Sequence, residues 1–418
     1  MMRTSGAVAG FFALKLVAGL VLLALSARWL RVDQFAVYSQ LFLFLALLTT
    51  VSAAGAQNGV IREVAVRRER PEAAGQTVRG ALALWLAATL LATLVSLVAA
   101  RQVAELLTGS AAVAPLVPWL TLAAMLGGAG IVLVAALTGH GRAPLALSLQ
   151  GVGMLGGTAG CVAFLAWQEP ALAVLAFAGG PVLTSLLALA ATREWRTGWK
   201  REDLREARHL LAFSTSFLAV AALMPVTLFL LRDLYRDQFG AVALGYWLAA
   251  NRISDVTSQL LGLFMGQAFL PGYAALAPGP ERRRFAVRTG LAAAALFGSG
   301  AAMFAIAPRF WVGLVLSAQF LPAVPFIVAY LCGDVLRVVT SVQQYRALAE
   351  RRLRDYVLIE ALAAGVLAAL VILLIALGAG TAPALAYPLA WGGTGLFVIA
   401  IQGQSGGFRL RVGRSHAE

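Results

Sequence analysis

Twelve apolar runs of about 20 residues, separated by polar connections, constrain the fold of this chain more than any other feature. A run of this length can cross the hydrocarbon core of a bilayer as a helix, which satisfies every backbone N–H and C=O group internally. We therefore predict an all-helical, polytopic membrane protein with about 12 transmembrane helices and no separate soluble domain. The runs begin near Gly6, Ala36, Gly80, Leu116, Leu145, Ala171, Leu210, Ala241, Thr289, Leu321, Tyr356 and Ala384.

The basic residues of the connections alternate between two sides of the predicted membrane. Most of the 33 Lys and Arg residues follow even-numbered runs, as around Arg68, Arg205 and Arg352, and Arg79 is assigned to the first of these connections. The few on the other side include Arg232. Cytoplasmic loops carry the excess of Lys and Arg, so we expect both termini and the even-numbered connections in the cytoplasm.

The longest charged connection, Thr192 to His209, divides the runs into two sets of six. An even number of spans brings both halves into the membrane from the same side, which is typical of parallel repeats. We predict two six-helix lobes, formed by residues 1–199 and 200–418.

Gly151, Gly153 and Gly156 formally match the dinucleotide-binding pattern G-x-G-x-x-G. That pattern requires a preceding strand and an acidic residue about 20 positions later. Here the glycines lie within the fifth apolar run, and residues 171–176 carry no acid. The glycines are therefore predicted to allow close packing of helices.

Charged side chains inside the apolar runs point to function. A charge at the bilayer centre costs about 3 kcal/mol on insertion scales, so several such residues indicate a polar path through the bundle. They are Lys15 in the first run, Arg252 and Asp255 in the eighth, Asp334 and Arg337 in the tenth, and Glu360 near the start of the eleventh.

Two interpretations of these charges stay open. Arg252 with Asp255, and Asp334 with Arg337, are three residues apart and share a helix face, so each could be a self-neutralising pair that holds the bundle together. Alternatively, both faces could line a water-filled cavity, which the polar neighbours of the pairs favour. Glu360 could line the cavity or lie at the interface. The favouring neighbours are Asn251, Ser254, Ser258, Gln259, Ser341, Gln343 and Gln344.

Lys15 has no acidic partner on its own predicted helix. An ammonium group in a cavity is a suitable docking point for a phosphate, which lysine binds as a point charge. The sequence gives no support for metal-binding or disulfide chemistry. Cys161 and Cys332 both lie in apolar runs, and the three histidines lie beside loops or in the tail. We therefore expect no metal site, cofactor or disulfide, and since positive-inside loops account for the net charge of +14, no nucleic-acid partner.

Short motifs along the whole chain carry a resemblance. They are Lys15, Gly55 with Asn58-Gly59-Val60, Trp247 followed by Ile253-Ser254-Asp255, Leu270-Pro271, Gly333-Asp334-Val335-Leu336 with Arg337, and Tyr356 with Glu360. With these motifs the chain resembles the Wzx-type (O-antigen) flippases for lipid-linked oligosaccharides of the MOP superfamily, most closely the lipid III flippases of enterobacterial common antigen synthesis. Arg252 departs from the small polar residue expected there.

The resemblance implies two six-helix lobes around a central cavity in a bacterial inner membrane. It implies that an undecaprenyl-pyrophosphate-linked oligosaccharide is moved from the cytoplasmic to the periplasmic leaflet by alternating access. Membrane lipids, a proton or sodium counter-ion and polysaccharide polymerase components are the further expected partners. The expected substrate-binding residues are Lys15, Asn58, Arg252 and Arg337, and the expected coupling or charge-pair residues are Asp255, Asp334 and Glu360.

Two rival functions remain. A MATE-like antiporter of small molecules would favour carboxylates and aromatic residues for cationic substrates, whereas this cavity would carry Lys15, Arg252 and Arg337. A membrane polysaccharide polymerase or ligase would need catalytic groups on a large external loop. The longest connections on that side, residues 100–115 and 308–320, are short, so we expect a transporter and not an enzyme.

Overall fold

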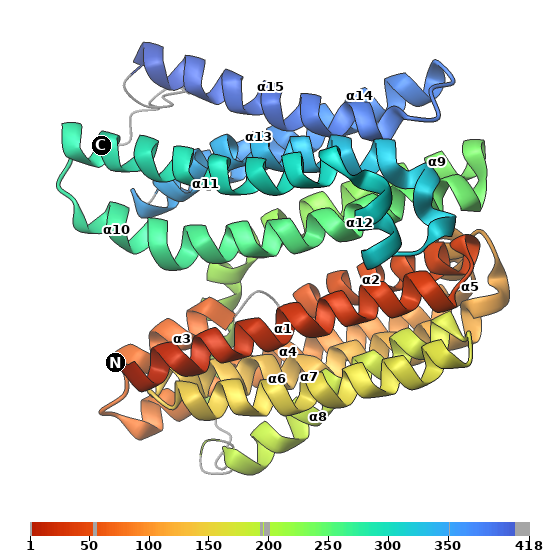
Figure 1. The fold of residues 1–418 in the computed structure, drawn as a ribbon. Coiled ribbons are helices and arrows are strands. Elements are labelled where there is room, and N and C mark those ends of the chain that lie inside the picture. The colour runs from red at the N-terminus through yellow and green to blue at the C-terminus, as the bar shows by residue number, and fades with distance from the viewer. Residues whose placement is uncertain (1, 53–56, 193–194, 196–200, 351, 406–418) are drawn as a thin grey trace, which may run out of the picture. The chain divides into compact units, whose positions relative to one another are not determined.

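The computed structural model describes residues 2–52, 57–192, 195, 201–350 and 352–405, and these residues form helices joined by short turns, without a strand. The first half contains α1 (Met2–Trp29), α2 (Val32–Ser52), α3 (Gln57–Val66), α4 (Pro71–Val98), α5 (Ala100–Thr108), η1 (Ala111–Leu116), α6 (Val117–Gly139), α7 (Ala143–Ala166) and α8 (Pro170–Ala191). The second half contains α9 (Arg201–Phe264), η3 (Met265–Phe269), α10 (Leu270–Ala275), α11 (Pro280–Ile306), α12 (Pro308–Val315), η4 (Ala318–Ala323), α13 (Val324–Ala349), α14 (Leu353–Ala376) and α15 (Ala382–Ser405) (Figure 1).

All twelve predicted runs lie in helices, so the predicted fold class is confirmed. Within the described ranges, nine helical segments are long and apolar enough to cross a membrane. The other three runs lie in α1 and in α9, a 64-residue helix that contains two of them. A kink at Gly240 (φ 85°, ψ 169°) divides α9 into two limbs, and glycine adopts this left-handed backbone without steric cost.

Proline marks the start of many of these helices. It lies in the first turn, where its missing N–H has no intrahelical partner to lose and its fixed φ suits the helix. Proline therefore sets these boundaries locally. Helices α4, α6, α7, α8, α10, α11 and α13 all begin in this way.

The chain forms two compact units. Unit 1 comprises residues 1–248 and 312–321, and unit 2 comprises residues 249–311 and 322–418. Compactness thus groups the first limb of α9 with unit 1. The lobe boundary after residue 199 stays a prediction.

In unit 1, α6 packs against α2, α4 and α8, and α7 packs against α8 (Figure 1). A Cβ atom on Gly153 would lie 2.5 Å from the carbonyl oxygen of Gly180, and one on Gly157 would lie 2.6 Å from that of Phe177. No side chain fits at such distances. The prediction that glycines of this run allow close helix packing is confirmed.

Segment 312–321 belongs to unit 1, and hydrogen bonds join it to the end of α1. Arg28 donates to the carbonyl oxygens of Leu314 at 2.7 Å and Leu316 at 3.4 Å. In return, Ser317 donates to the carbonyl of Ala27 at 2.7 Å, and Gln319 donates to the same carbonyl at 2.9 Å. These bonds satisfy carbonyl groups that helix ends leave without a partner.

In unit 2, α13 packs against α11, α14 and α15 (Figure 1). Leu261, Met265 and Phe269 of α9 and η3 form a buried apolar cluster with Val338 and Val342 of α13. This packing leaves another face of α13 for polar contacts with α9, α14 and α15.

Candidate functional site

Asp334 of α13 is the centre of a buried polar site in unit 2. Its residue surface is only 3% exposed. One carboxylate oxygen accepts hydrogen bonds from the hydroxyls of Ser254 and Tyr387, both at 2.8 Å, and the other accepts from Thr257. The donors come from α9 and α15, so three helices meet at this carboxylate. Buried charge is costly unless hydrogen-bonded, and the three hydroxyls meet that requirement.

Arg337 lies one turn further along α13 and has its own partners. Its guanidinium donates to Ser258 at 2.6 Å and lies over the ring of Trp391, with Cζ 4.4 Å from the ring centroid. Trp391 is buried, whereas Arg337 remains partly exposed. The interpretation of Asp334 and Arg337 as a self-contained pair therefore misses the contacts that hold each of them, which come from α9 and α15.

The polar face of α13 continues beyond Arg337. Asp334, Arg337, Ser341 and Gln344 follow one another at helical spacing and therefore share a face. Gln344 is buried and donates to Glu360 of α14 at 2.6 Å. Glu360, predicted to lie either at the interface or in a cavity, thus contacts this face.

The α9 pair lies close to this site in sequence but differs in its contacts. Asp255 is partly exposed and accepts a hydrogen bond from the buried Asn251 at 3.0 Å. Arg252 is also partly exposed. Both residues occupy the α9 segment that supplies Ser254, Thr257 and Ser258 to the Asp334 site.

The remaining predicted residues belong to unit 1. Lys15 lies on α1 with its side chain exposed. Asn58 lies on α3, and its side chain falls outside the described part of the structure.

The aromatic residues beside Asp334 and Arg337 were not predicted from the sequence. The ring of Tyr387 stacks on Tyr330, with centroids 4.0 Å apart and planes at 8°. Tyr387 and Trp391 are four residues apart on α15, so both face the same way. This spacing was visible in the sequence, but aromatic residues are common in apolar runs and carried no distinctive signal.

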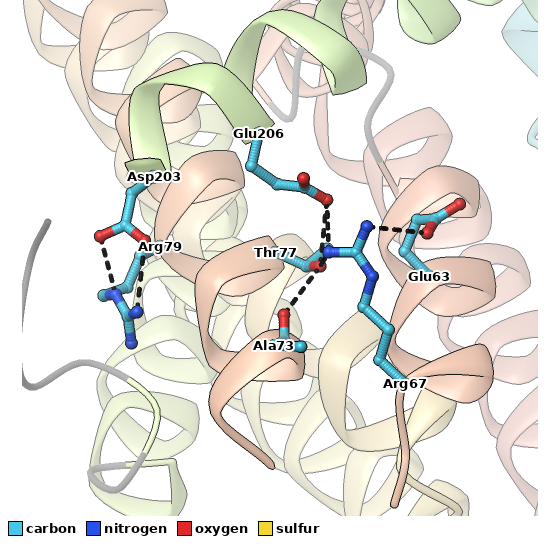
Figure 2. A network of polar contacts seen from close by, with 7 residues as sticks. All are labelled: Glu63, Arg67, Ala73, Thr77, Arg79, Asp203 and Glu206. Atoms are coloured by element: carbon cyan, nitrogen blue, oxygen red, sulfur yellow. Dashed lines mark hydrogen bonds and ion pairs between the residues drawn. The ribbon is translucent and has the colours of Figure 1, made fainter. Parts of the chain in front are cut away.

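A second charged network lies in unit 1, where α3 and α4 meet the start of α9 (Figure 2). Arg79 forms a bidentate ion pair with Asp203, with nitrogen–oxygen distances of 2.9 and 3.2 Å. Beside it, Arg67 lies between Glu63 at 3.3 Å and Glu206 at 2.7 Å. Thr77 accepts a hydrogen bond from Arg67 at 2.9 Å.

Two basic residues predicted for loops lie inside helices instead. Arg79 is a buried residue of α4. Arg232 is a 2% exposed residue of α9, and it donates to the side chain of Gln40 at 3.4 Å. These helices extend beyond the apolar runs, and tertiary partners compensate the buried charges. Counting charges along the sequence could not show this.

Residues 10–276 match the protein family described as polysaccharide biosynthesis protein. The chain belongs to this family. No curated protein sequence matches the chain at a significant level.

Solved structures of membrane transporters share the fold over nearly the whole chain. An inward-facing multidrug resistance MATE family transporter of the MOP superfamily has a TM-score of 0.69 at 14% identity, covering 94% of this chain and 96% of the transporter. The lipid II flippase MurJ, in an inward closed conformation, has a TM-score of 0.72 at 10% identity, covering 96% and 88%. A MOP superfamily transporter from Pyrococcus furiosus has a TM-score of 0.61 at 14% identity, covering 96% and 95%. At such identities the likeness establishes the MOP fold but does not identify the substrate.

Neutral hydroxyl groups hold the Asp334 carboxylate. Hydroxyl groups rotate and both donate and accept, so the carboxylate can take up a proton without breaking an ion pair. Arg337 is partly exposed, and a guanidinium group has the charge and planar geometry that suit an anion.

Proposed function

We propose that this polysaccharide biosynthesis family member is a flippase. It moves an undecaprenyl-pyrophosphate-linked oligosaccharide from the cytoplasmic to the periplasmic leaflet of a bacterial inner membrane by alternating access. The observation that carries the proposal is the polar face of α13, where the guanidinium of Arg337 donates to Ser258 and lies over the ring of Trp391. A sugar diphosphate cannot cross hydrocarbon at a useful rate without partners that replace water. Such a face offers those partners.

In this proposal the basic residues receive the substrate. Lys15 binds the diphosphate, because it is an exposed cationic residue in the middle of α1. Arg252 and Arg337 bind further polar groups of the substrate, as does Asn58. The lipid tail stays among membrane lipids outside the bundle.

The acidic residues serve coupling or charge pairing. Asp334 is the best placed of them, because its buried carboxylate is held by neutral hydroxyls. A proton or sodium ion from a transmembrane gradient would be its counter-ion. Asp255 and Glu360 have amide partners and assist in the same role. Polysaccharide polymerase components would take the delivered product.

The test measures transport of lipid-linked oligosaccharide in proteoliposomes that contain the purified protein. Lys15→Ala should lower the initial rate by about tenfold or more, because a charge-assisted contact to the diphosphate is lost. Lys15→Arg should retain part of the rate. Arg101→Ala is the control, since Arg101 is an exposed cation at the end of another helix. A normal rate in the alanine variant would overturn the assignment of Lys15.

A MATE-like antiporter is the second candidate, favoured by one observation. Tyr330, Tyr387 and Trp391 beside Asp334 form a surface that also suits an organic cation. In the same proteoliposomes, exchange of such a cation for protons, without transport of the lipid-linked substrate, would replace the flippase proposal by this one.

The membrane orientation needs its own test, with both termini proposed to be cytoplasmic. Reporter fusions after Arg68, Arg205 and Arg352 should report the cytoplasm. Fusions near Glu169 and Thr381 should report the periplasm. A periplasmic signal at Arg205 would overturn the twelve-span model.

A further inference from the structure

A cluster of arginines surrounds Tyr273 at one end of unit 2. Tyr273 is the buried aromatic residue of α10, 2% exposed, and it stacks on Phe269 with centroids 5.4 Å apart. Its hydroxyl donates to Glu350 at 2.7 Å and accepts from Arg346 at 3.1 Å. Tyr273 is thus held rigidly and presents its ring to the start of α11.

Arg282, in the first turn of α11, lies over this ring with Cζ 4.1 Å from the centroid. Its Nε is buried without a hydrogen-bond partner, and within the described residues its guanidinium is held by the aromatic contact alone. A buried donor without an acceptor is costly, because it has lost water without a replacement. The stack therefore holds a planar set of donors in position for an acceptor from outside the protein.

The acidic residues nearby are already engaged. Glu350 accepts from Tyr273 with one oxygen and lies 2.8 Å from Arg352 with the other. Although burial alone would raise it, the hydrogen bond from Tyr273 and the charge of Arg352 hold the pKa of the Glu350 carboxyl below its usual value. Asp355 also pairs with Arg352 at 2.5 Å. The charge of Arg282 is therefore not neutralised by these carboxylates.

Arg346 contributes a second guanidinium to the same ring. Its Cζ lies 5.9 Å from the centroid of Tyr273. Its Nε bonds to the tyrosine hydroxyl, and one terminal nitrogen donates to Gln343 at 2.9 Å. Among the described residues, no acceptor is bonded to the other terminal nitrogen. The guanidinium groups of Arg282 and Arg346 thus both lie beside the buried ring of Tyr273.

We propose that Arg282 and Arg346 bind the phosphate group of an anionic phospholipid. The site lies where the charged first turn of α11 meets its apolar run, which is the depth of lipid head groups. It also lies on the side that carries the excess of basic residues, and anionic lipids attract such clusters. Phosphate oxygens match the planar donors of arginine in charge and geometry. The bound lipid joins α10, α11 and α13 at their ends and leaves the Asp334 site unoccupied, so this site does not depend on the flippase proposal.

The experiment measures lipid retention by the purified full-length protein with native mass spectrometry. Detergent is supplemented with phosphatidylglycerol, with phosphatidylcholine or with inorganic pyrophosphate. The wild type should retain phosphatidylglycerol with about a tenfold preference over phosphatidylcholine, since the two differ in net charge. Arg282→Gln should reduce retention by about tenfold, because charge-assisted hydrogen bonds are lost.

Arg284→Gln is the matched control, because Arg284 is an exposed residue of the same turn and the charge change is identical. Its retention should change by less than about twofold. Equal losses in both variants would reduce the site to diffuse surface charge and overturn the proposal. Pyrophosphate that displaces the lipid completely at equal concentration would overturn the assignment to a lipid.

Hydrogen exchange of the wild type keeps the proposal testable if Arg282→Gln does not fold. Phosphatidylglycerol should slow amide exchange at residues 281–285 several-fold relative to phosphatidylcholine, because the bound phosphate ties down the start of α11. Identical exchange in the two lipids would overturn the proposal.

Discussion

The two units stabilise their buried charged side chains in different ways. In unit 1, Arg79 and Asp203 meet each other in a bidentate ion pair, with side-chain exposures of 5% and 0% (Figure 2). In unit 2, Asp334 is surrounded by hydroxyl groups, and Arg337 by a hydroxyl and an indole ring. The first arrangement pairs two charges directly, whereas in the second each charge is held by neutral groups from other helices.

We infer that this difference distinguishes charges that stabilise the fold from charges that can change their partners. When one member of a buried ion pair is removed, the other stays buried without a counter-charge. Such a pair therefore resists any change in its protonation or contacts. Neutral hydroxyls can reorient when a carboxylate gains a proton or when an arginine meets an anion. We therefore propose that the Arg79–Asp203 pair anchors the start of α9 and that the Asp334 site takes part in transport.

Breaking the ion pair should give the largest effect. Arg79→Ala should destabilise the protein by about 3 to 5 kcal/mol, because Asp203 would remain buried without its counter-charge. Thermal unfolding in detergent measures this loss. The double variant Arg79→Met with Asp203→Leu should recover most of the stability, since no lone charge remains. If Arg79→Ala unfolded like the wild type, the pair would not anchor α9.

Asp334→Asn should behave in the opposite way. It keeps the shape of the side chain, and the weaker hydrogen bonds are offset by removal of a buried charge, so stability should change by about 1 kcal/mol or less. Transport should nevertheless fall by about tenfold or more if the site couples a proton or pairs a charge. Asp255→Asn should cause a milder loss, since Asp255 is partly exposed.

Rates measured from pH 6 to 8 sharpen this prediction. Residual activity of Asp334→Asn without pH dependence would indicate that the aspartate itself is protonated. Normal rates of both asparagine variants across this range would remove the distinction between the two units.

Arg337→Lys tests whether the ring contact matters beyond charge. Lysine keeps the charge but lacks the planar group that lies over Trp391 at 4.4 Å. Since a cation–π contact contributes about 0.5 to 1 kcal/mol, transport should fall by about two- to fivefold. Arg337→Gln should fall further because it also removes the charge. Equal rates for the lysine variant and the wild type would show that a point charge is sufficient.

The rim of the unit 1 network should give the smallest effect. Arg67 and Glu206 are only partly buried, with side-chain exposures of 26% and 17%. Solvent screens such pairs, so Arg67→Ala should cost about 1 kcal/mol or less, with unchanged transport. Thermal unfolding beside Arg79→Ala makes the comparison direct. A loss as large as that of Arg79→Ala would mean that the network acts as one unit.

The charged residues of unit 2 were predictable, but their contacts were not. Asp334 and Arg337 are conspicuous because charge inside an apolar run is expensive. Their spacing predicts a shared face but names no partner. Tyr387 lies 53 residues from Asp334, and Ser254 lies 80 residues from it. Pairing over such separations depends on how helices pack.

The sequence by itself determined three features of this protein. They are the twelve apolar helical runs, the prolines at the start of many helices, and the glycines that let α7 approach α8. Hydrocarbon forces backbone groups to bond within each segment, so these features are local. Only the tertiary structure decided which buried charges are neutralised. Arg79 was predicted to lie in a loop, but it lies in a helix and pairs with Asp203, 124 residues away. Arg337 shares a helix face with Asp334, but it also contacts Ser258 of α9 and Trp391 of α15. The reason is that a side chain's electrostatic environment comes from neighbouring helices, and their arrangement depends on packing of the whole unit.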